Sequence, residues 1–347
     1  MIWLTWRQFR TQAIVAIVAL VVLGGALVAL GLWMRHAYDT GMGTCTTPDD
    51  CSSEERAFRS TFATPASLLS MALLILPALL GSFWGAPLIT RELETGTHRM
   101  VWTQSVMRRR WLAVKLGLVG GAALALAGAF SMLLTWATDP IVDLAGGRFE
   151  ALMFGSSNVA PIGYAVFALV LGVAVGLLVR RTVAAMAITI AVFAVIQLAV
   201  PFLVREHYMP AVEESVAVTE TSLDDVEGLA LKGEPPGADG KLDPDTRVVV
   251  DGYDKPGAWM LTPEMELLDP TGSPVDTNRA EPCFRGQGGR GGAATCLAAL
   301  NLHFDIAYHP ASRYWPFQGI ETAGFLVLAA VLAGFGLWRI PRGIAAA

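Results

Sequence analysis

Residues 13–34 read AIVAIVALVVLGGALVALGLWM and contain no Asp, Glu, Lys or Arg. Five further stretches share this character, at residues 65–89, 116–137, 159–179, 182–204 and 322–338. The hydrocarbon core of a bilayer is about 30 Å thick, and a helix of about twenty apolar residues is long enough to cross it. The sequence therefore predicts an all-α polytopic membrane protein with six transmembrane helices.

The basic residues gather on one side of the predicted membrane. If the N-terminus is cytoplasmic, twelve of the 25 Lys and Arg residues and only two of the 30 Asp and Glu residues are inside. They lie in residues 1–12, 90–115, 180–181 and 339–347. Short basic loops face the cytoplasm. We therefore expect both termini in the cytoplasm of a multi-pass protein of the cell (plasma) membrane.

All four cysteines lie in predicted outside segments. Cys45 and Cys51 are in the first of these segments, and Cys283 and Cys296 are in the last. An oxidising exterior lets disulfides persist, and two local bridges, Cys45–Cys51 and Cys283–Cys296, are the simplest of the pairings that four cysteines allow. A zinc site is the alternative, although no CxxC spacing and no nearby His pair supports it.

The outside segments differ in length and composition. Residues 35–64 predict a polar loop and residues 138–158 a simple connector. Residues 205–318 are acidic and rich in Gly and Pro, and their strand-like run at residues 247–250 is flanked by turn signals. We expect a loop-rich extracytoplasmic domain there, with short strands, between helices 5 and 6.

The two ends of the chain complete the domain organisation. Residues 1–204 hold helices 1–5, and residues 319–347 hold helix 6 and a cytoplasmic tail. Residues 1–12 combine Trp and Arg at helical spacing, which predicts an interfacial N-terminal helix. A frayed tail is the alternative.

No constellation of reactive groups supports an enzyme. The HExxH and GxSxG patterns are absent, and so is the phosphate-binding loop GxxxxGK[ST]. Gly240-Lys241 matches the end of that loop, but Leu242 stands where a hydroxyl residue is required. We expect no catalytic residue, metal site or cofactor on this chain. The acids between residues 239 and 245 lack the EF-hand spacing for calcium, and we interpret them as a solvated turn.

A few polar and small residues stand out in the predicted helices. Gln197 lies deep in the fifth, where an interhelical hydrogen bond is its simplest role. Glu321 opens the sixth, where a carboxylate is favourable at a helix N-terminus; a place in a gate or translocation pathway is the alternative for both residues. The glycine pairs Gly81/Gly85, Gly117/Gly121 and Gly172/Gly176 predict close helix packing, within the bundle or between subunits.

The longest inside segment, residues 90–115, carries the most information. Glu92 and Glu94 lead it, and Gly96-Thr97 offers a break and a cap. An apolar stretch around Trp102 follows, and then the cluster Arg108–Arg110. Tethered to two spans, such a segment could transmit a partner's movement into the membrane. The alternative is a basic loop that only sets orientation and contacts anionic lipid.

These residues carry a family resemblance. The pattern Arg-Glu-x-Glu-x-Gly-Thr at residues 91–97, followed by the Arg cluster and Lys115, resembles the ABC-2 type permeases, the membrane subunits of ABC exporters. Four further phrases resemble the actinobacterial branch of that family: Leu4-Thr5-Trp6-Arg7-Gln8, Val101-Trp102-Thr103-Gln104-Ser105, Arg180-Arg181-Thr182 and residues 310–318, PASRYWPFQ.

The resemblance implies a six-helix subunit that pairs with a second permease copy and with cytoplasmic ATP-binding subunits, which hold ATP and Mg. It places the coupling to the ATPase on residues of the inside segment: Arg91, Glu92, Glu94, Gly96, Thr97, Arg108, Arg109 and Arg110. The chain departs from the family at Thr103-Gln104-Ser105, where many members have Pro after Thr, and in the length of its outside domain.

The function expected from these observations is transport. The chain would be the permease subunit of an ATP-driven exporter that moves an amphipathic compound, a drug, a lipid or a peptide outward. Its partners would be the ATP-binding subunit, a second permease copy and the lipid bilayer, with no nucleic acid. The alternative is a membrane-anchored receptor or scaffold whose outside domain binds a ligand.

Overall fold

The computed structural model describes residues 2–43, 48–96, 107–145, 147–224, 226, 228–233, 246–275, 279–280, 282–283 and 289–343. The chain divides into two compact units. The helical unit is formed by Met1–Tyr208 and Tyr314–Ala347, and the sheet domain is formed by Met209–Arg313. The sheet domain is therefore an insertion between the fifth and sixth long apolar helices.

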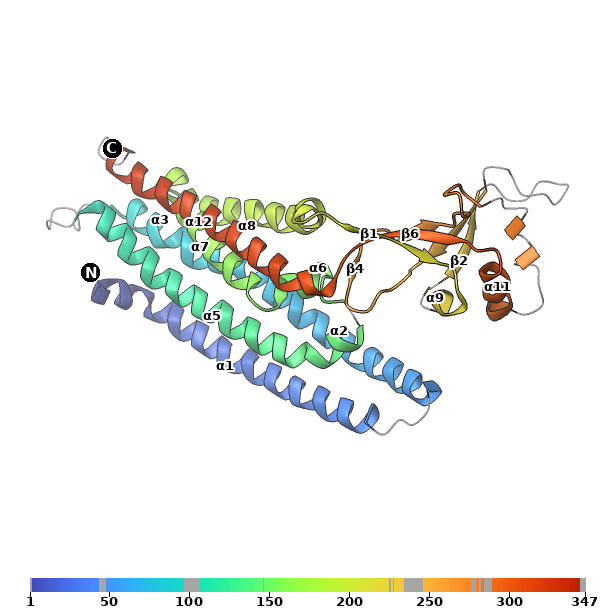
Figure 1. Ribbon diagram of the computed structural model, residues 1–347. Coiled ribbons are helices and arrows are strands. Elements are labelled where there is room, and N and C mark those ends of the chain that lie inside the picture. The colour runs from blue at the N-terminus through green and yellow to red at the C-terminus, as the bar shows by residue number, and fades with distance from the viewer. Residues whose placement is uncertain are drawn as a thin grey trace. The chain divides into compact units, whose positions relative to one another are not determined.

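The helical unit consists of long helices joined by short links (Figure 1). Its elements are α1 (Ile2–Gly41), α2 (Pro48–Leu80), the π-helix η1 (Gly81–Gly85), α3 (Ala86–Glu94), α5 (Arg108–Ala145), α6 (Ala151–Ser156), α7 (Ala160–Val179), α8 (Thr182–Ala199), the π-helix η2 (Val200–Val204), the 3-10 helix η3 (Arg205–His207) and α12 (Tyr314–Gly343). Within the described residues, six helices are long and apolar enough to cross a membrane, which confirms the predicted number.

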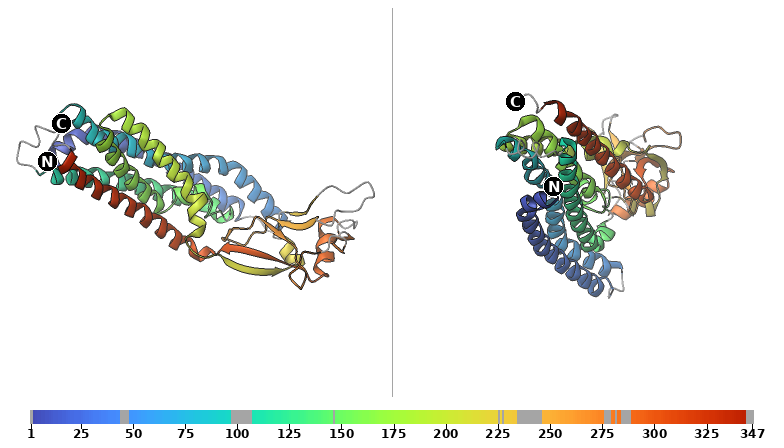
Figure 2. Two further views of the ribbon diagram at one scale, coloured as in Figure 1. Left: turned by 90° about the horizontal axis from the view of Figure 1, so that it is seen from above. Right: turned by 90° about the vertical axis from the view of Figure 1, so that its left-hand side faces the viewer.

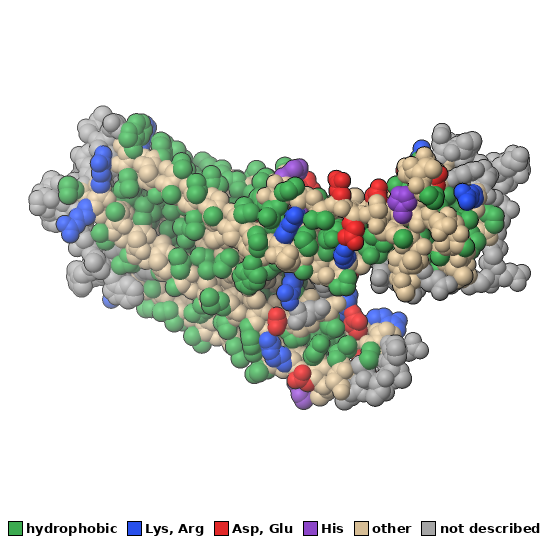
Figure 3. Space-filling view, in the orientation of Figure 1, with side chains coloured by type: hydrophobic (Ala, Val, Ile, Leu, Met, Phe, Trp, Pro, Cys, Tyr) green, Lys and Arg blue, Asp and Glu red, His purple; other side chains and the backbone are tan. Residues whose placement is uncertain are grey.

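Helix α7 forms the centre of the helical unit. Sixteen of its 20 residues are buried, and it packs against α12, α5, α2 and α3. Helices α1 and α8 lie at the periphery, where apolar side chains such as Val21 and Val183 are more than half exposed. The space-filling view shows hydrophobic side chains over the middle of the visible helical surface (Figure 3). A surface of this composition suits contact with lipid.

The first residues of α1 and the last residues of α12 lie at the same end of the bundle (Figures 1 and 2). We call this the terminal end. The opposite end, where the chain leaves η3 for the sheet domain and returns into α12, is called the insertion end. The described residues of the segments predicted to be inside the cell, 2–12, 90–96, 107–115, 180–181 and 339–343, lie toward the terminal end.

Close helix contacts explain two of the three glycine pairs. A Cβ atom on Gly81 would lie 2.4 Å from the carbonyl oxygen of Ala168, and one on Gly172 would lie 2.1 Å from the carbonyl oxygen of Gly81. Only glycine fits where η1 and α7 meet so closely. A Cβ on Gly117 or Gly121 would meet no heavy atom within 4 Å. Packing within the described chain therefore accounts for the pairs that begin at Gly81 and Gly172.

The helices at the insertion end extend beyond the apolar stretches, which corrects the polar loop predicted at residues 35–64. Most of that segment is helix, because α1 continues to Gly41 and α2 begins at Pro48. The reason is an apolar seam, in which Phe58 and Phe62 are buried against Met34 and Ile141. At the other end of α1, residues 2–12 are helical and continuous with the first span.

The connector predicted at residues 138–158 also contains helix. Helix α5 continues through Pro140 to Ala145, and the short helix α6 follows. Phe149 and Phe154 bracket the start of α6, and both pack edge-to-face against Tyr314 of α12 with ring centres 5.6 Å apart. Edge-to-face packing of aromatic rings is favourable beyond the area it buries. This aromatic contact holds the connector against the bundle.

The sheet domain contains two small antiparallel sheets. One sheet has the order β1 (Val212–Ala217), β6 (His303–His309), β4 (Trp259–Met260), and the other has the order β2 (Gly228–Lys232), β3 (Arg247–Asp251), β5 (Glu264–Glu266). The helices α9 (Glu220–Asp224) and α11 (Gly289–Ala298) and the short η4 (Ala311–Arg313) complete the described elements. The strand predicted at residues 247–250 is the central strand β3, whereas the rest of the domain has more sheet than a loop-rich segment implies.

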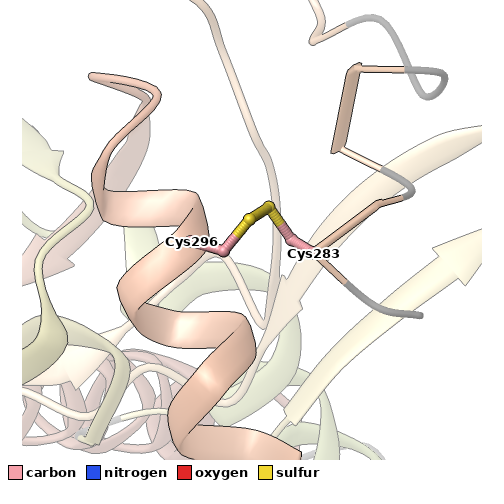
Figure 4. Close-up of a disulfide and its surroundings, with 2 residues drawn as sticks. All are labelled: Cys283 and Cys296. Carbon is pink, nitrogen blue, oxygen red and sulfur yellow. A yellow bond between two sulfur atoms is a disulfide. The ribbon is translucent and has the colours of Figure 1, made fainter. Parts of the chain in front are cut away.

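The sheet domain has its own apolar core. Val248 and Val250 of β3 are buried with Phe304 and Ile306 of β6, Leu297 of α11 and other apolar side chains. Cys283 and Cys296 form a disulfide with a Cα–Cα distance of 5.4 Å, which attaches α11 to the preceding segment (Figure 4). Cys45, from the other predicted pair, lies outside the described residues.

Candidate functional site

An ion pair joins two helices at the terminal end. The Nζ atom of Lys115, on α5, lies 2.5 Å from Oε1 of Glu92, on α3, and both side chains are almost fully buried. The ammonium also donates to the carbonyl oxygen of Leu88 at 3.2 Å and lies 4.7 Å from the centre of the Trp111 ring. A buried pair is tolerable when further hydrogen bonds satisfy its charges. This pair fixes α3 against α5.

Glu94 joins α3 to a third helix. Its carboxylate accepts hydrogen bonds from the backbone N–H and the hydroxyl of Thr182, both at 2.7 Å. Thr182 is the first residue of α8, where backbone N–H groups lack partners within the helix and negative charge is favourable. The hydroxyl of Thr182 also lies 2.8 Å from that of Thr90. The start of α8 is thereby capped by α3.

Helix α3 ends next to these contacts. The N–H of Thr95 donates to the carbonyl oxygen of Arg91 at 3.1 Å and ends α3. Gly96 follows with φ of +71°, a left-handed conformation that glycine adopts without strain. Thr97, a predicted coupling residue, lies outside the described residues, and the description resumes just before Arg108, where α5 begins.

Exposed arginines surround the base of this link. Arg91 on α3, Arg109 and Arg110 on α5, and Arg180 and Arg181 between α7 and α8 all have exposed side chains. Segments far apart in the sequence thus bring positive charge to one end of the bundle, where it can attract an acidic partner. We call Glu92, Lys115, Glu94, Thr182 and Thr90 the terminal-end cluster. The Arg–Glu–x–Glu segment, Lys115 and the Arg180-Arg181-Thr182 phrase meet there.

A second polar cluster lies at the insertion end. The Nε and Nη2 atoms of Arg205 donate to the two carboxylate oxygens of Glu321, each at 2.9 Å. Tyr164 of α7 also donates to this carboxylate, and so does Tyr208 at 3.1 Å. The guanidinium lies 4.0 Å from the centre of the Phe154 ring. We call Arg205, Glu321, Tyr164 and Tyr208 the insertion-end cluster; it ties α7, η3 and α12 together.

The positions of Glu321 and Gln197 differ from the roles expected for them. Helix α12 begins at Tyr314, so Glu321 lies two turns inside the helix and does not cap its N-terminus. Its side chain is 2% exposed, and its carboxylate is neutralised by Arg205. Gln197 lies nearby, because its Nε2 atom and the Tyr164 hydroxyl are both within 4 Å of a Cβ built on Gly155. Among the described residues, Oε1 of Gln197 has no hydrogen-bond partner.

Two members of the insertion-end cluster could not be singled out from the sequence. Arg205 directly follows the apolar stretch 182–204, so in the sequence it looks like an ordinary residue at the end of a membrane span. The π-helix η2, which contains Pro201, directly precedes Arg205, and irregular turns of this kind are common at functional sites. Tyr164 carries no charge inside an apolar stretch. Their sequence separation from Glu321 exceeds 110 residues, so only the tertiary fold brings them together.

A comparison with known protein families gives one match. The model of a family described as ABC-2 membrane transporter related matches residues 17–205, which is more than half of the chain. The matched region runs from within α1 through α8 and η2 to Arg205, the first residue of η3, and includes the terminal-end cluster. No curated protein and no solved structure matches the chain.

Proposed function

This chain belongs to the ABC-2 membrane transporter related family, and on that basis we propose that it is the membrane-spanning permease subunit of an ATP-driven exporter. The chain itself is not an enzyme in this proposal. A separate cytoplasmic ATP-binding subunit holds ATP and Mg and hydrolyses the nucleotide, and a second permease copy completes the pathway. The cargo is an amphipathic compound, drug, lipid or peptide that moves outward across the plasma membrane.

One observation carries the coupling part of the proposal. Helix α3, which leads into the link to α5, is anchored by Glu92–Lys115 to α5 and by Glu94–Thr182 to α8. A partner that pushes on the link therefore displaces three helices together, since the buried ion pair and the helix cap resist separate movement. The exposed arginines around the link supply a basic surface for that partner. In this mechanism Glu92 holds two helices of this chain together, and Arg91, Arg109 and Arg110 face the partner.

The insertion-end cluster is the proposed outer gate. Arg205, Tyr164 and Glu321 hold α7, η3 and α12 together at the insertion end, which is the outer side in this proposal. An outward-open pathway between these helices requires that the carboxylate of Glu321 give up some of these bonds. Gln197 lies beside the cluster, and among the described residues its Oε1 atom accepts no hydrogen bond; in this proposal it supplies a replacement polar contact along the pathway.

Coupling is tested in a complex with the ATP-binding subunit, reconstituted in vesicles. Glu94→Ala removes both hydrogen bonds between α3 and the start of α8, and Thr182→Val removes the one made by the hydroxyl while the backbone N–H remains; neither variant creates a buried charge. We expect both variants to insert and to bind the ATP-binding subunit, but to lose most of the cargo-stimulated ATP hydrolysis. Glu54→Ala removes an exposed carboxylate from α2, at the insertion end, and serves as the matched control. Normal cargo-stimulated ATP hydrolysis in both Glu94→Ala and Thr182→Val would refute the coupling mechanism.

The sheet domain favours a second candidate function, that of a membrane-anchored receptor or scaffold. It has its own apolar core and a disulfide, as a ligand-binding domain would. Co-purification distinguishes the two functions: an ATP-binding subunit with a phosphate-binding loop supports export, whereas a kinase or regulator supports sensing. A neighbouring reading frame for either protein gives the same information.

A further inference from the structure

Strand β1 of the sheet domain has one edge that no described strand covers. Among the described residues β1 pairs with β6 alone, and it stands at the end of its sheet. Glu213, Glu214 and Ser215, in the middle of the strand, are exposed. The uncovered edge of a sheet presents unpaired backbone N–H and C=O groups. An extended peptide can therefore join the sheet at β1.

The register shows which backbone groups of β1 point away from β6. In the antiparallel register of the two strands, the N–H of Val218 donates to the carbonyl oxygen of Leu302 at 2.9 Å. The backbone groups of successive residues in a strand point alternately to its two sides. The even-numbered residues of β1 therefore face β6, and the backbone groups of Glu213, Ser215 and Ala217 face outward.

One of these outward groups already has a partner within the chain. The hydroxyl of Ser222 donates to the carbonyl oxygen of Ala217 at 3.0 Å, which ends the open part of the edge. Within the described part of the chain, the backbone N–H and C=O groups of Glu213 and Ser215 have no such partner. These four groups are enough to align two residues of an incoming strand.

A hollow of about 420 Å³ lies against β1 and β6 beside this edge. Glu213 is opposite Ala307, and Ser215 is opposite Asp305 and donates a hydrogen bond to it, so these four side chains share one face. Glu213 and Asp305 are diagonal neighbours, which are about 7–8 Å apart across two strands. Because Ala307 and Ser215 between them are small, a Lys or Arg side chain of a ligand can lie there and contact both carboxylates.

The charges of these two carboxylates are not neutralised by a neighbouring base. The described ion pairs of the sheet domain use other acids, namely Glu264, Glu266 and Glu214. Neither Glu213 nor Asp305 is in an ion pair with a described residue. The sequence of the domain holds 18 acidic and 8 basic residues, and an excess of this size attracts cations from a distance.

We propose that the open edge of β1 binds a basic peptide in an extended conformation. The peptide backbone bonds to Glu213 and Ser215. Its basic side chains stand two residues apart, because such side chains point to the same face of a strand, and they lie beside Glu213 and Asp305. A second copy of the chain is a poor occupant, because two β1 edges side by side would bring their carboxylates together, and like charges across strands are destabilising.

This inference concerns the sheet domain alone and does not rest on the export function. Binding is measured with the full chain, in an uncharged detergent and without an ATP-binding subunit, by fluorescence anisotropy of the peptide STKVKTS carrying an uncharged fluorophore. The peptide STKKVTS has the same composition, but its adjacent lysines point to opposite faces. The peptide STEVETS has the opposite charge. We expect STKVKTS to bind about threefold or more tighter than STKKVTS, and STEVETS not to bind.

Substitutions test the charge and the open edge separately. Glu213→Gln and Asp305→Asn should each weaken binding of STKVKTS about threefold. Glu264→Gln is the matched control, because this carboxylate is exposed on β5 and does not line the hollow. Ser215→Pro removes an outward N–H, which proline can do at a sheet edge, and should weaken binding about fivefold. Ser215→Ala removes only the hydroxyl and is its control.

Four outcomes overturn the proposal: equal binding of the three peptides, unchanged binding in both carboxylate variants, an equal loss in Glu264→Gln, or unchanged binding in a folded Ser215→Pro. Self-association of the chain that Ser215→Pro abolishes and Ser215→Ala retains would also overturn it, because the edge would then belong to a second copy. If Ser215→Pro fails to fold, the comparison of STKVKTS with STKKVTS decides whether the peptide lies as a strand, and equal affinities would then be the refutation.

Discussion

Glu321→Gln is the change that most sharply tests the insertion-end cluster. The substitution keeps the shape of the side chain and an acceptor oxygen, but it removes the charge that neutralises Arg205. Arg205 is 1% exposed, so its guanidinium would remain buried without its carboxylate partner. Removing one partner of a buried ion pair costs about 3–5 kcal/mol. We expect a loss of this size in the free energy of unfolding.

The measurement is the thermal unfolding midpoint of the purified chain in detergent. For chains of about 150–250 residues, 1 kcal/mol corresponds to about 2–4 °C. Glu321→Gln should therefore lower the midpoint by about 6 °C or more. Glu206→Gln changes an exposed carboxylate next to Arg205 in sequence and should leave the midpoint within about 2 °C.

The double variant Arg205→Met, Glu321→Gln decides whether the charge is the cause. Because it removes both charges, it should recover most of the stability lost in Glu321→Gln. If the double variant is less stable than Glu321→Gln, the ion pair contributes through packing and hydrogen bonding of Arg205. The charge argument, and the gate that rests on it, would then be wrong.

Three further predictions concern other parts of the chain. Gly172→Ala should lower the unfolding midpoint strongly, because its Cβ would lie 2.1 Å from a carbonyl oxygen of η1. Gly117→Ala is the control and should be neutral, because its Cβ meets no atom within 4 Å. Equal effects of the two substitutions would contradict this packing. Hydrogen bonds from the ammonium of Lys255 and from a tyrosine hydroxyl hold the pKa of Glu214 below its ordinary value of 4.5. The contribution of Glu214 to stability is therefore present above pH 4.5 and is lost as the pH falls through the lowered pKa. Lys255→Met should flatten this acid dependence of the free energy of unfolding. Cys296→Ser opens the disulfide of the sheet domain and should cost about 3 kcal/mol, seen as faster proteolysis of that domain, and unchanged proteolysis would speak against this cost.

The six spans were predictable because each is a continuous apolar run, and a bilayer demands no more than length and composition. The ends of the helices were not. Residues 35–64 carry many polar side chains, and their helical structure depends on Phe58 and Phe62 packing against residues of α1 and α5. Such packing involves distant segments, so local composition predicted a loop where the fold extends two helices.

The candidate site was likewise predictable only in part from the sequence. Glu92 and Glu94 of the terminal-end cluster were visible in the motif at residues 91–97, but their partners in the fold were not. Glu92 pairs with Lys115, which is 23 residues away, and Glu94 caps the helix that begins at Thr182. The sequence indicated that these acids were unusual among basic neighbours. It could not show that both acids bind helices of the same chain, because the spacing of residues along the sequence does not determine which helices are neighbours in the fold.

Helix α8 connects the two clusters. It begins at Thr182, which is held by Glu94, and its continuation through η2 ends at Arg205, which is held by Glu321. Between these points only Ala185, Thr189 and Phe193 are buried, so few side chains of α8 hold its middle in place. A helix is stiff over such a length, with a rise of about 1.5 Å per residue. In the proposed mechanism, a displacement applied at Thr182 would reach Arg205 through α8 and η2, and it would there strain the bonds of the proposed gate.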